Sequence, residues 1–281
     1  VGVNITAAPL NVTGNLSLNS NLTINVAGTK FAVGVLPLVS YAAKSGSGSL
    51  TLGTLPSGVV ATLVDNGSGL IYLNITQVAL PRWDGTVDTI WDTTTANWVD
   101  QVLNTASVYV DPNPVMFDDL ATGVGGTTVT LNSTVAPKEV IYNNTTAKPY
   151  TLSGSGKISG SGTLTKRNTG TATISGILND YTGVTRIEGG TLSVDVISNG
   201  GVASPLGAAT SASSNLVLAG GTLTYTGATT TTDRGFLIDA NNSIFNTTND
   251  LTVTGTVSSG LVANFNKAGA GKLTIAGVGS N

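Results

Sequence analysis

Residues 162–194 read GTLTKRNTGTATISGILNDYTGVTRIEGGTLSV, and this stretch decides the fold class. Apolar side chains alternate with threonine and serine, for example at Ala172 and Ile174 and again at Leu192 and Val194. A period of two is typical of β-strands that bury one side and expose the other. Glycines separate the short strands, since glycine adopts positive φ without steric cost. We predict corners at Gly162, Gly170, Gly176, Gly183 and Gly190.

The same pattern returns near the end of the sequence. Residues 265–277, FNKAGAGKLTIAG, align with residues 164–176, LTKRNTGTATISG, so that Lys267 matches Lys166. This second copy adds corner glycines at Gly271 and Gly277. A recurring unit of strands and corners without helical periodicity is typical of a solenoid. We expect both lysines to be solvated corner or edge residues that discourage side-by-side aggregation.

The stretch resembles the passenger-associated transport repeat, also called the autotransporter-associated β-strand repeat. The matching positions are Gly162, Leu164, Thr165, Lys166, Gly170, Ile174, Gly176, Tyr181, Gly183, Thr185, Ile187, Gly190 and Leu192. The chain departs from the pattern at Asn168, which replaces glycine, and at Ala172, which replaces leucine. Because asparagine tolerates left-handed geometry, the first departure is mild. The resemblance implies a bacterial passenger or passenger-like protein, with the repeat thought to assist export by folding outside the cell.

The whole chain is predicted to be all-β and to form a right-handed parallel β-helix, or β-solenoid, with a loop-rich excursion. The handedness follows from the resemblance and from the right-handed preference of parallel crossovers. At a few tens of residues per turn, we expect roughly ten to fourteen turns. The predicted organisation is solenoid turns over 1–80, a Trp- and Asp-rich joining excursion over 81–119 with a short helical turn near 95–103, and solenoid turns over 120–281 containing the copies at 162–194 and 265–277.

Three local features carry further structural predictions. Asn11, Asn15, Asn19, Asn21 and Asn25 fall between the first apolar positions. Their amides either hydrogen-bond from one turn to the next or face solvent, and the sequence leaves both open. The tripeptide Asp65-Asn66-Gly67 is a strong turn signal, which predicts a β-hairpin or a tight corner. Residues 204–214, SPLGAATSASS, are predicted to be a loop or a bulging corner.

The amino-acid composition excludes several classes of function. Charged residues are 10% of the 281 positions, well below the roughly 25% usual for globular domains. The chain has no cysteine and no histidine, which excludes disulfides, thiolate or histidine metal sites and a Ser-His-Asp triad. The net charge of −3 argues against a nucleic-acid partner. No apolar run approaches the ~20 residues of a membrane helix, so no membrane insertion is expected. The profile is typical of an extracellular β-fibre.

The candidate ligand contacts lie in the excursion over 81–119. They are Trp83, Trp91, Trp98, Asp84, Asp118 and Asp119. The tryptophans could stack on a sugar, but we favour the interpretation that they fill a small satellite core. Paired carboxylates could cleave a glycosidic bond, yet Asp118 and Asp119 are adjacent and would point to opposite faces of a strand. We therefore predict no catalytic residues, no enzyme activity and no cofactor, with calcium on the carboxylates as the one alternative.

Our first functional hypothesis is a structural protein at the bacterial cell surface or in the extracellular space. It forms or belongs to a fibre, because an open solenoid end exposes unpaired backbone groups that template another chain. The partner is then another copy, stacked head to tail, or the flanking modules of a longer parent. The alternative is an adhesin that binds an extracellular glycan through 81–119. Exposed tryptophans would favour the adhesin, and buried tryptophans would count against it.

Overall fold

A computed structural model describes residues 10–26, 34–55, 59–78, 80–101, 104–260 and 264–277. The described part is all-β, with one short 3₁₀ turn, η1 (Ser213–Asn215), and no α-helix. None of its helical segments is long and apolar enough to cross a membrane. The chain divides into two compact units, residues 1–80 with 100–104, and residues 81–99 with 105–281. The predicted fold class is confirmed, because most of the chain is a β-solenoid of stacked parallel strands.

The first unit combines parallel turns with an antiparallel hairpin. Its strands are β1 (Leu10–Ser17), β2 (Leu22–Ile24), β3 (Gly34–Ser45), β4 (Leu50–Leu52), β5 (Val59–Asp65) and β6 (Leu70–Val78). β1 pairs with β3 and β2 pairs with β4 in parallel, whereas β6 is antiparallel to both β3 and β5. The turn signal at Asp65-Asn66-Gly67 is thus confirmed as a hairpin. Gly67 has φ +69°, and Asn66 Oδ1 accepts hydrogen bonds from the backbone N–H groups of Ser68 and Leu70.

The asparagines of this unit hydrogen-bond from one turn to the next. Their partners are serine or threonine rather than another amide: Asn11 with Ser40, Asn15 with Ser45, Asn21 with Ser49, and Asn25 with Thr54. Asn19 instead accepts from Ser17 within its own turn. All five asparagines are also exposed, so each of the two interpretations that the sequence left open holds in part: four residues bond from turn to turn, but to hydroxyl groups and on the solvated surface.

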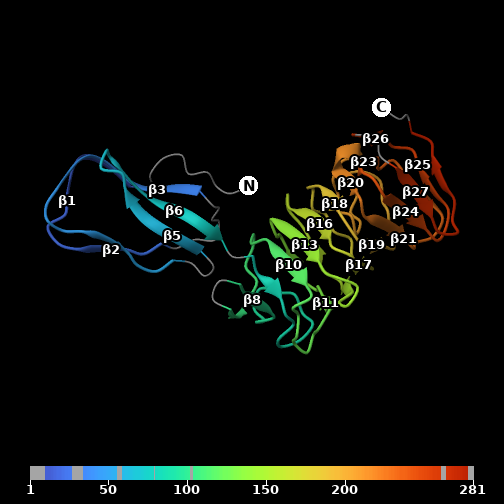
Figure 1. The fold of residues 1–281 in the computed structure, drawn as a ribbon, viewed down its shortest axis with the longest axis horizontal. Coiled ribbons are helices and arrows are strands. Elements are labelled where there is room, and N and C mark those ends of the chain that lie inside the picture. Colours follow the sequence, from blue (N-terminus) through green and yellow to red (C-terminus); the bar gives the residue numbers. More distant parts are fainter. Residues whose placement is uncertain are drawn as a thin grey trace. The chain divides into compact units, whose positions relative to one another are not determined.

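The second unit is a parallel solenoid whose turns contribute one strand to each of up to three sheets (Figure 1). The first sheet contains β7 (Arg82–Trp83), β10 (Val115–Asp118), β13 (Glu139–Asn143), β16 (Thr163–Arg167), β18 (Thr185–Ile187), β20 (Leu216–Ala219), β23 (Phe236–Ala240) and β26 (Val257–Ser259), and is extended beyond β7 by β8 (Trp98–Asp100) and β9 (Thr105–Ser107). The second sheet contains β11 (Thr128–Thr130), β14 (Tyr150–Ser153), β17 (Thr171–Ile174), β19 (Thr191–Val194), β21 (Thr222–Tyr225), β24 (Ser243–Thr247) and β27 (Phe265–Ala268).

The third side of the solenoid is less regular. It carries β12 (Thr134–Val135) paired with β15 (Lys157–Ile158), and then β22 (Thr230–Thr232), β25 (Leu251–Val253) and β28 (Leu273–Ile275). Between these groups the chain forms bends and loops, including the predicted loop at 204–214, which is confirmed. The buried guanidinium of Arg234 stabilises this loop by donating hydrogen bonds to the backbone oxygens of Ser198 and Gly207.

The number of turns is smaller than predicted. The second unit has about seven turns rather than ten to fourteen. Two features explain the difference. Residues 1–80 fold into a separate unit, and the loop between β19 and β20 lengthens one turn. Residues 81–99 and 105–119, which we expected to form an excursion from the solenoid, belong to the same compact unit as the later turns.

The interior of the solenoid is formed by the predicted apolar alternation. Leu164, Ala172, Ile174, Ile187, Leu192 and Val194 are each at most 1% exposed. They belong to a single hydrophobic core that continues from the tryptophans of the first turns to Val253. Parallel strands stacked in this way keep each inward side chain over its equivalent in the previous turn.

The two repeat copies share a local motif although they occupy different sheets. Lys166 lies on β16 in the first sheet, and Lys267 lies on β27 in the second. Each ammonium donates to the backbone oxygens of the next two residues. Two positions after each lysine the backbone has positive φ, +60° at Asn168 and +81° at Gly269. The prediction that Asn168 can replace glycine in left-handed geometry is therefore confirmed.

The prediction that both lysines are solvated is wrong for Lys166. Its side chain is 0% exposed and its ammonium forms no ion pair within the described part of the chain, whereas Lys267 is exposed. The reason is that β16 is covered by the strands of the following turn, so the side chain must enter the core and place its charge at the corner. Burial lowers the pKa of Lys166 to about 8.

The buried lysine predicts a pH dependence of stability. A base whose pKa is lower in the folded state binds fewer protons there than in the unfolded chain between about pH 8 and 10.5. Stability therefore rises with pH across this window. Relative to Lys166→Met, the free energy of unfolding of the wild-type chain should increase by about 2 kcal/mol between pH 7 and pH 10. Urea titrations at several pH values measure this difference, and a constant difference would contradict the buried charge.

Candidate functional site

The three tryptophans of 81–119 form the core of the first solenoid turns. Trp83, Trp91 and Trp98 are all 0% exposed. Trp83 and Trp98 face each other across the antiparallel pair β7 and β8, with ring centroids 5.2 Å apart. Trp91 lies 5.3 Å from Trp98. The same cluster includes Tyr109, Phe117, Tyr142 and Tyr150.

This burial corrects the ligand-contact prediction for the tryptophans. Sugar stacking requires an accessible ring face, and these rings have none. The rings are continuous with the main hydrophobic core, so the expected satellite core is also replaced by a larger one. The indole nitrogen of Trp83 donates to the backbone oxygen of Gly126 at 2.8 Å, which fixes the ring.

A buried asparagine organises the loop between the tryptophans. Asn97 is 0% exposed, and its Oδ1 accepts from the backbone N–H groups of Val87 and Asp88. Its Nδ2 donates to Asp88 Oδ1 at 2.6 Å and to the backbone oxygen of Ile90 at 2.8 Å. This network leads directly into β8, so the helical turn predicted near 95–103 is wrong for its described residues. The sequence around Asn97 carries no motif that would have indicated its role.

The carboxylates of the predicted site are occupied by local donors. Asp84 accepts from the backbone N–H and hydroxyl of Thr122 and from the hydroxyl of Thr86. Burial favours a higher pKa, but these hydrogen bonds outweigh it and hold the pKa of Asp84 below its ordinary value. The carboxylate therefore stays ionised and joins two neighbouring segments of the first turns.

Asp118 and Asp119 act separately. Asp118 ends β10 and accepts from the backbone N–H of Leu120 at 2.9 Å, with Arg82 Nη1 3.8 Å away. Burial raises the pKa of Asp118. Asp119 instead accepts from the backbone N–H and hydroxyl of Thr145, at 2.8 and 2.6 Å. Among the described residues, no three acidic, histidine or cysteine side chains gather as a metal site would require. These carboxylates therefore hold the corners after the strands by accepting hydrogen bonds from nearby backbone and hydroxyl groups.

The predicted corner glycines fall into two structural kinds. Gly176 and Gly190 have positive φ, as the sequence argument required. The others lack positive φ but lie against the previous turn, where a Cβ atom would come within 2.0–2.3 Å of a backbone oxygen: Gly162, Gly170, Gly183, Gly271 and Gly277. For these five, the close approach of stacked turns demands glycine, rather than the backbone conformation that we expected. Gly190 combines both features, because a Cβ atom there would lie 2.2 Å from the backbone oxygen of Gly170.

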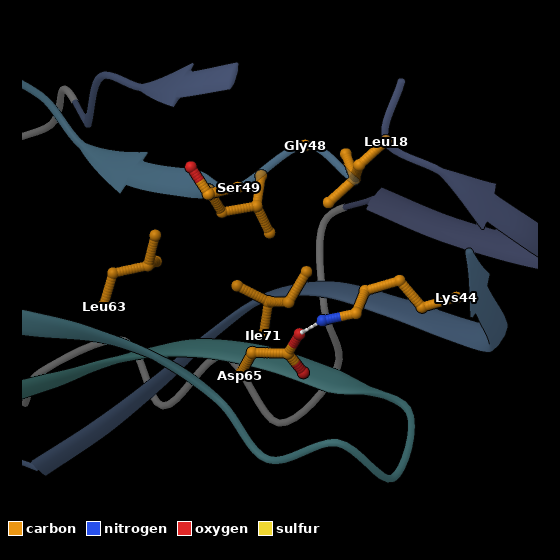
Figure 2. Close-up of a pocket in the computed structure, with 8 residues that line it drawn as sticks. Leu18, Lys44, Gly48, Ser49, Leu63, Asp65 and Ile71 are labelled. Atoms are coloured by element: carbon orange, nitrogen blue, oxygen red, sulfur yellow. Dashed lines mark hydrogen bonds and ion pairs between the residues drawn. The ribbon is translucent and has the colours of Figure 1, made fainter. Parts of the chain in front are cut away.

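A pocket lies within the first unit (Figure 2). Its volume is about 330 Å³, at the lower end of the range for small-molecule sites. The lining residues are Leu18, Lys44, Gly48, Ser49, Leu50, Leu63, Asp65 and Ile71. They come from strands and corners far apart in the sequence, which is why no sequence pattern pointed to them.

One ion pair dominates the chemistry of this pocket. Lys44 is paired with Asp65, and Figure 2 shows the two side chains meeting beside Ile71. Asp65 also accepts from Tyr41 Oη at 2.6 Å and from the backbone N–H of Gly67 at 3.0 Å. Burial alone would raise the pKa of Asp65, but these donors hold it below its ordinary value. The Asp65 carboxylate is thus fully engaged by structural hydrogen bonds and an ion pair, and it is poorly suited to act as a base.

Comparison with known proteins agrees with this architecture. Residues 164–194 match the family model described as the passenger-associated-transport-repeat. A curated relative, the adhesin BmaC autotransporter of Brucella suis biovar 1 (strain 1330), is 45% identical over 123 residues. That match covers 43% of this chain and 4% of the relative, so the chain spans a small fraction of the relative's length. No solved structure matches the chain.

The fold and the matched repeat agree with each other. The second unit is a parallel β-solenoid whose residues 164–194 form a passenger-associated transport repeat, so the resemblance inferred from the sequence is confirmed. The chain also contains a separate unit of mixed parallel and antiparallel strands, residues 1–80 with 100–104, which lies outside the matched repeat.

Proposed function

We propose that this chain is a structural segment of an extracellular fibre at the bacterial surface, in which solenoid ends stack head to tail. The observation that carries the proposal is that the strands of the last described turn have a pairing partner on one side only. β26, β27 and β28 are the terminal strands of their sheets among the described residues. Such strands present unpaired backbone groups to a further turn.

Side chains at this turn support the same proposal. Ile275 on β28 is 44% exposed, and Phe265 and Leu273 are only partly buried. The residues that pair with Leu273 and Ile275 one turn earlier, Leu251 and Val253, are at most 1% exposed. A stacked turn would cover these apolar side chains and continue the backbone ladders, whether it comes from another copy or from a flanking module.

Ile275→Lys tests the stacking. A charge at an exposed strand edge disfavours pairing, so this variant should remain monomeric at concentrations where the wild-type chain associates. The matched control is Leu178→Lys, because Leu178 is 54% exposed in a loop on the side of the solenoid. Sedimentation velocity over a concentration series measures the difference. Equal association of both variants, or a wild-type chain that never associates, would contradict stacking through this end.

Adhesion is the second candidate function. It is favoured by one observation, the similarity to a relative that is named an adhesin. The buried tryptophans count against a glycan site built from their rings. An adhesive surface on or directly after residues 81–119 would instead have to use exposed side chains, such as Val87, Leu120 and Val124. Binding of the purified chain to a glycan array, compared with Val124→Asp, tests this alternative.

A further inference from the structure

The outer side of the second sheet carries a regular array of hydroxyl groups, which we call the hydroxyl face. One column runs through Thr128, Thr151, Thr173, Ser193 and Thr224, and a second runs through Thr171, Thr191 and Thr222. Within each column, every residue pairs with the next across adjacent parallel strands. No bulge interrupts these pairings, so the hydroxyls repeat at the spacing of the strands.

These hydroxyls are free to bind something outside the molecule. Within the described part of the chain, seven of the eight make no hydrogen bond, and Thr224 only accepts one from Asn246 Nδ2 at 3.3 Å. Thr128 and Thr151 are exposed, and the other six are partly exposed beside their neighbours. Each hydroxyl offers one donor and two acceptor positions. Because threonine is β-branched, most of these groups are held in few rotamers before anything binds.

The hydroxyl face also lacks charge. β11, β14, β17, β19 and β21 contain no charged residue. By contrast, the outer side of the first sheet carries a network in which Arg167 and Arg186 pair with Glu188, and Arg186 also pairs with Asp239. The two sides of one solenoid therefore differ sharply in chemistry.

This chemistry limits the occupant. An anionic polymer or phosphate needs cations, a sugar ring is usually held by an aromatic face, and a lipid surface needs large apolar side chains. The hydroxyl face has none of these. The remaining class of ligand is a neutral, periodic network of hydrogen-bonding groups.

The spacing of the strands can be compared with that of such a network. Parallel strands lie about 4.8 Å apart. Two water oxygens that bond tetrahedrally to a third, at about 2.8 Å each, lie about 4.5 Å apart.

We propose that the hydroxyl face binds ice, with the threonine columns holding rows of oxygen atoms in the ice lattice. The near match of the two spacings lets successive hydroxyls replace successive lattice oxygens. The absence of charge avoids strongly hydrated groups that would hold disordered water at the surface. This binding site is independent of the stacking of solenoid ends, since it lies on the side of the molecule.

Slow growth of ice from a dilute solution of the full chain tests the proposal. The wild-type chain should be enriched in the ice fraction and should slow the coarsening of ice crystals. Thr173→Lys places a charge in the centre of the longer column and should reduce both effects several-fold. The matched control is Thr231→Lys, because Thr231 is an exposed threonine on β22, on another side of the same solenoid. Far-UV circular dichroism and the urea midpoint establish that both variants are folded.

Three results would overturn the inference. The wild-type chain could be excluded from ice as an ordinary soluble protein is, or Thr173→Lys and Thr231→Lys could be retained equally. The chain could also bind insoluble crystalline polysaccharide but not ice, which would identify a different lattice as the ligand. Should Thr173→Lys be unfolded, Thr191→Lys in the second column provides the same comparison.

Discussion

Replacing Trp98 by alanine is expected to lower the free energy of unfolding of the solenoid by about 3–5 kcal/mol. The ring is 0% exposed and lies within 5.8 Å, centroid to centroid, of Trp83, Trp91, Tyr109 and Phe117. Its removal leaves a large cavity, and the four neighbouring aromatic rings are too rigid to move in and fill it. The loss should be concentrated in the first turns, because each turn of a solenoid is stabilised mainly by its neighbours.

Urea unfolding followed by tryptophan fluorescence measures this effect locally. The chain contains three tryptophans and all of them lie in this cluster, so the signal reports on the first turns alone. Trp98→Phe retains an aromatic ring and should cost much less than alanine. Val124→Ala is the control for a surface truncation, because Val124 is 83% exposed. A Trp98→Ala variant with an unchanged midpoint would show that the cluster does not support the solenoid.

Gly190→Ala is expected to have the second large effect. Gly190 has φ +58°, and a Cβ atom would lie 2.2 Å from the backbone oxygen of Gly170 and 2.5 Å from that of Asn168. Left-handed geometry costs a residue with a side chain about 1–2 kcal/mol. Displacing the backbone of the previous turn adds about 1–3 kcal/mol. Because the contact is with backbone rather than with a flexible side chain, it cannot relax cheaply.

Gly176→Ala is the matched control for this prediction. Gly176 has a similar φ of +69°, but nothing lies within 4 Å of the position that a Cβ atom would occupy there. Its substitution should therefore cost only the conformational contribution, about 1–2 kcal/mol. Thermal unfolding of both variants separates the two contributions. Equal losses would mean that the conformation of the corner, rather than the close stacking of turns, demands glycine at Gly190.

The strand pattern could be predicted because it is local. The period-two alternation at Ala172, Ile174, Leu192 and Val194 fixes which side chains face inward, and all four are buried. The left-handed geometry of Asn168 likewise follows from the residue type and its place in the repeat. These properties depend on the chain within a few residues, so the sequence alone was sufficient for them.

The failures concern contacts between turns. The sequence could not show that Lys166 is covered while Lys267 is exposed, because the two copies occupy different sheets and different positions in the stack. It also could not show that Gly162 and Gly183 lie against each other, which requires the register of successive turns. For the same reason, the sequence predicted a separate satellite core for the three tryptophans, which in fact belong to the main core. Their burial itself could be inferred from their size and rarity.

Cryo electron microscopy of the purified 281-residue chain is the most direct test of the proposed fibre. The proposal predicts unbranched filaments in which strands repeat about every 4.8 Å along the axis and continue from one molecule into the next. Isolated particles at every concentration, with the strands of the last turn left unpaired, would contradict head-to-tail stacking of this chain.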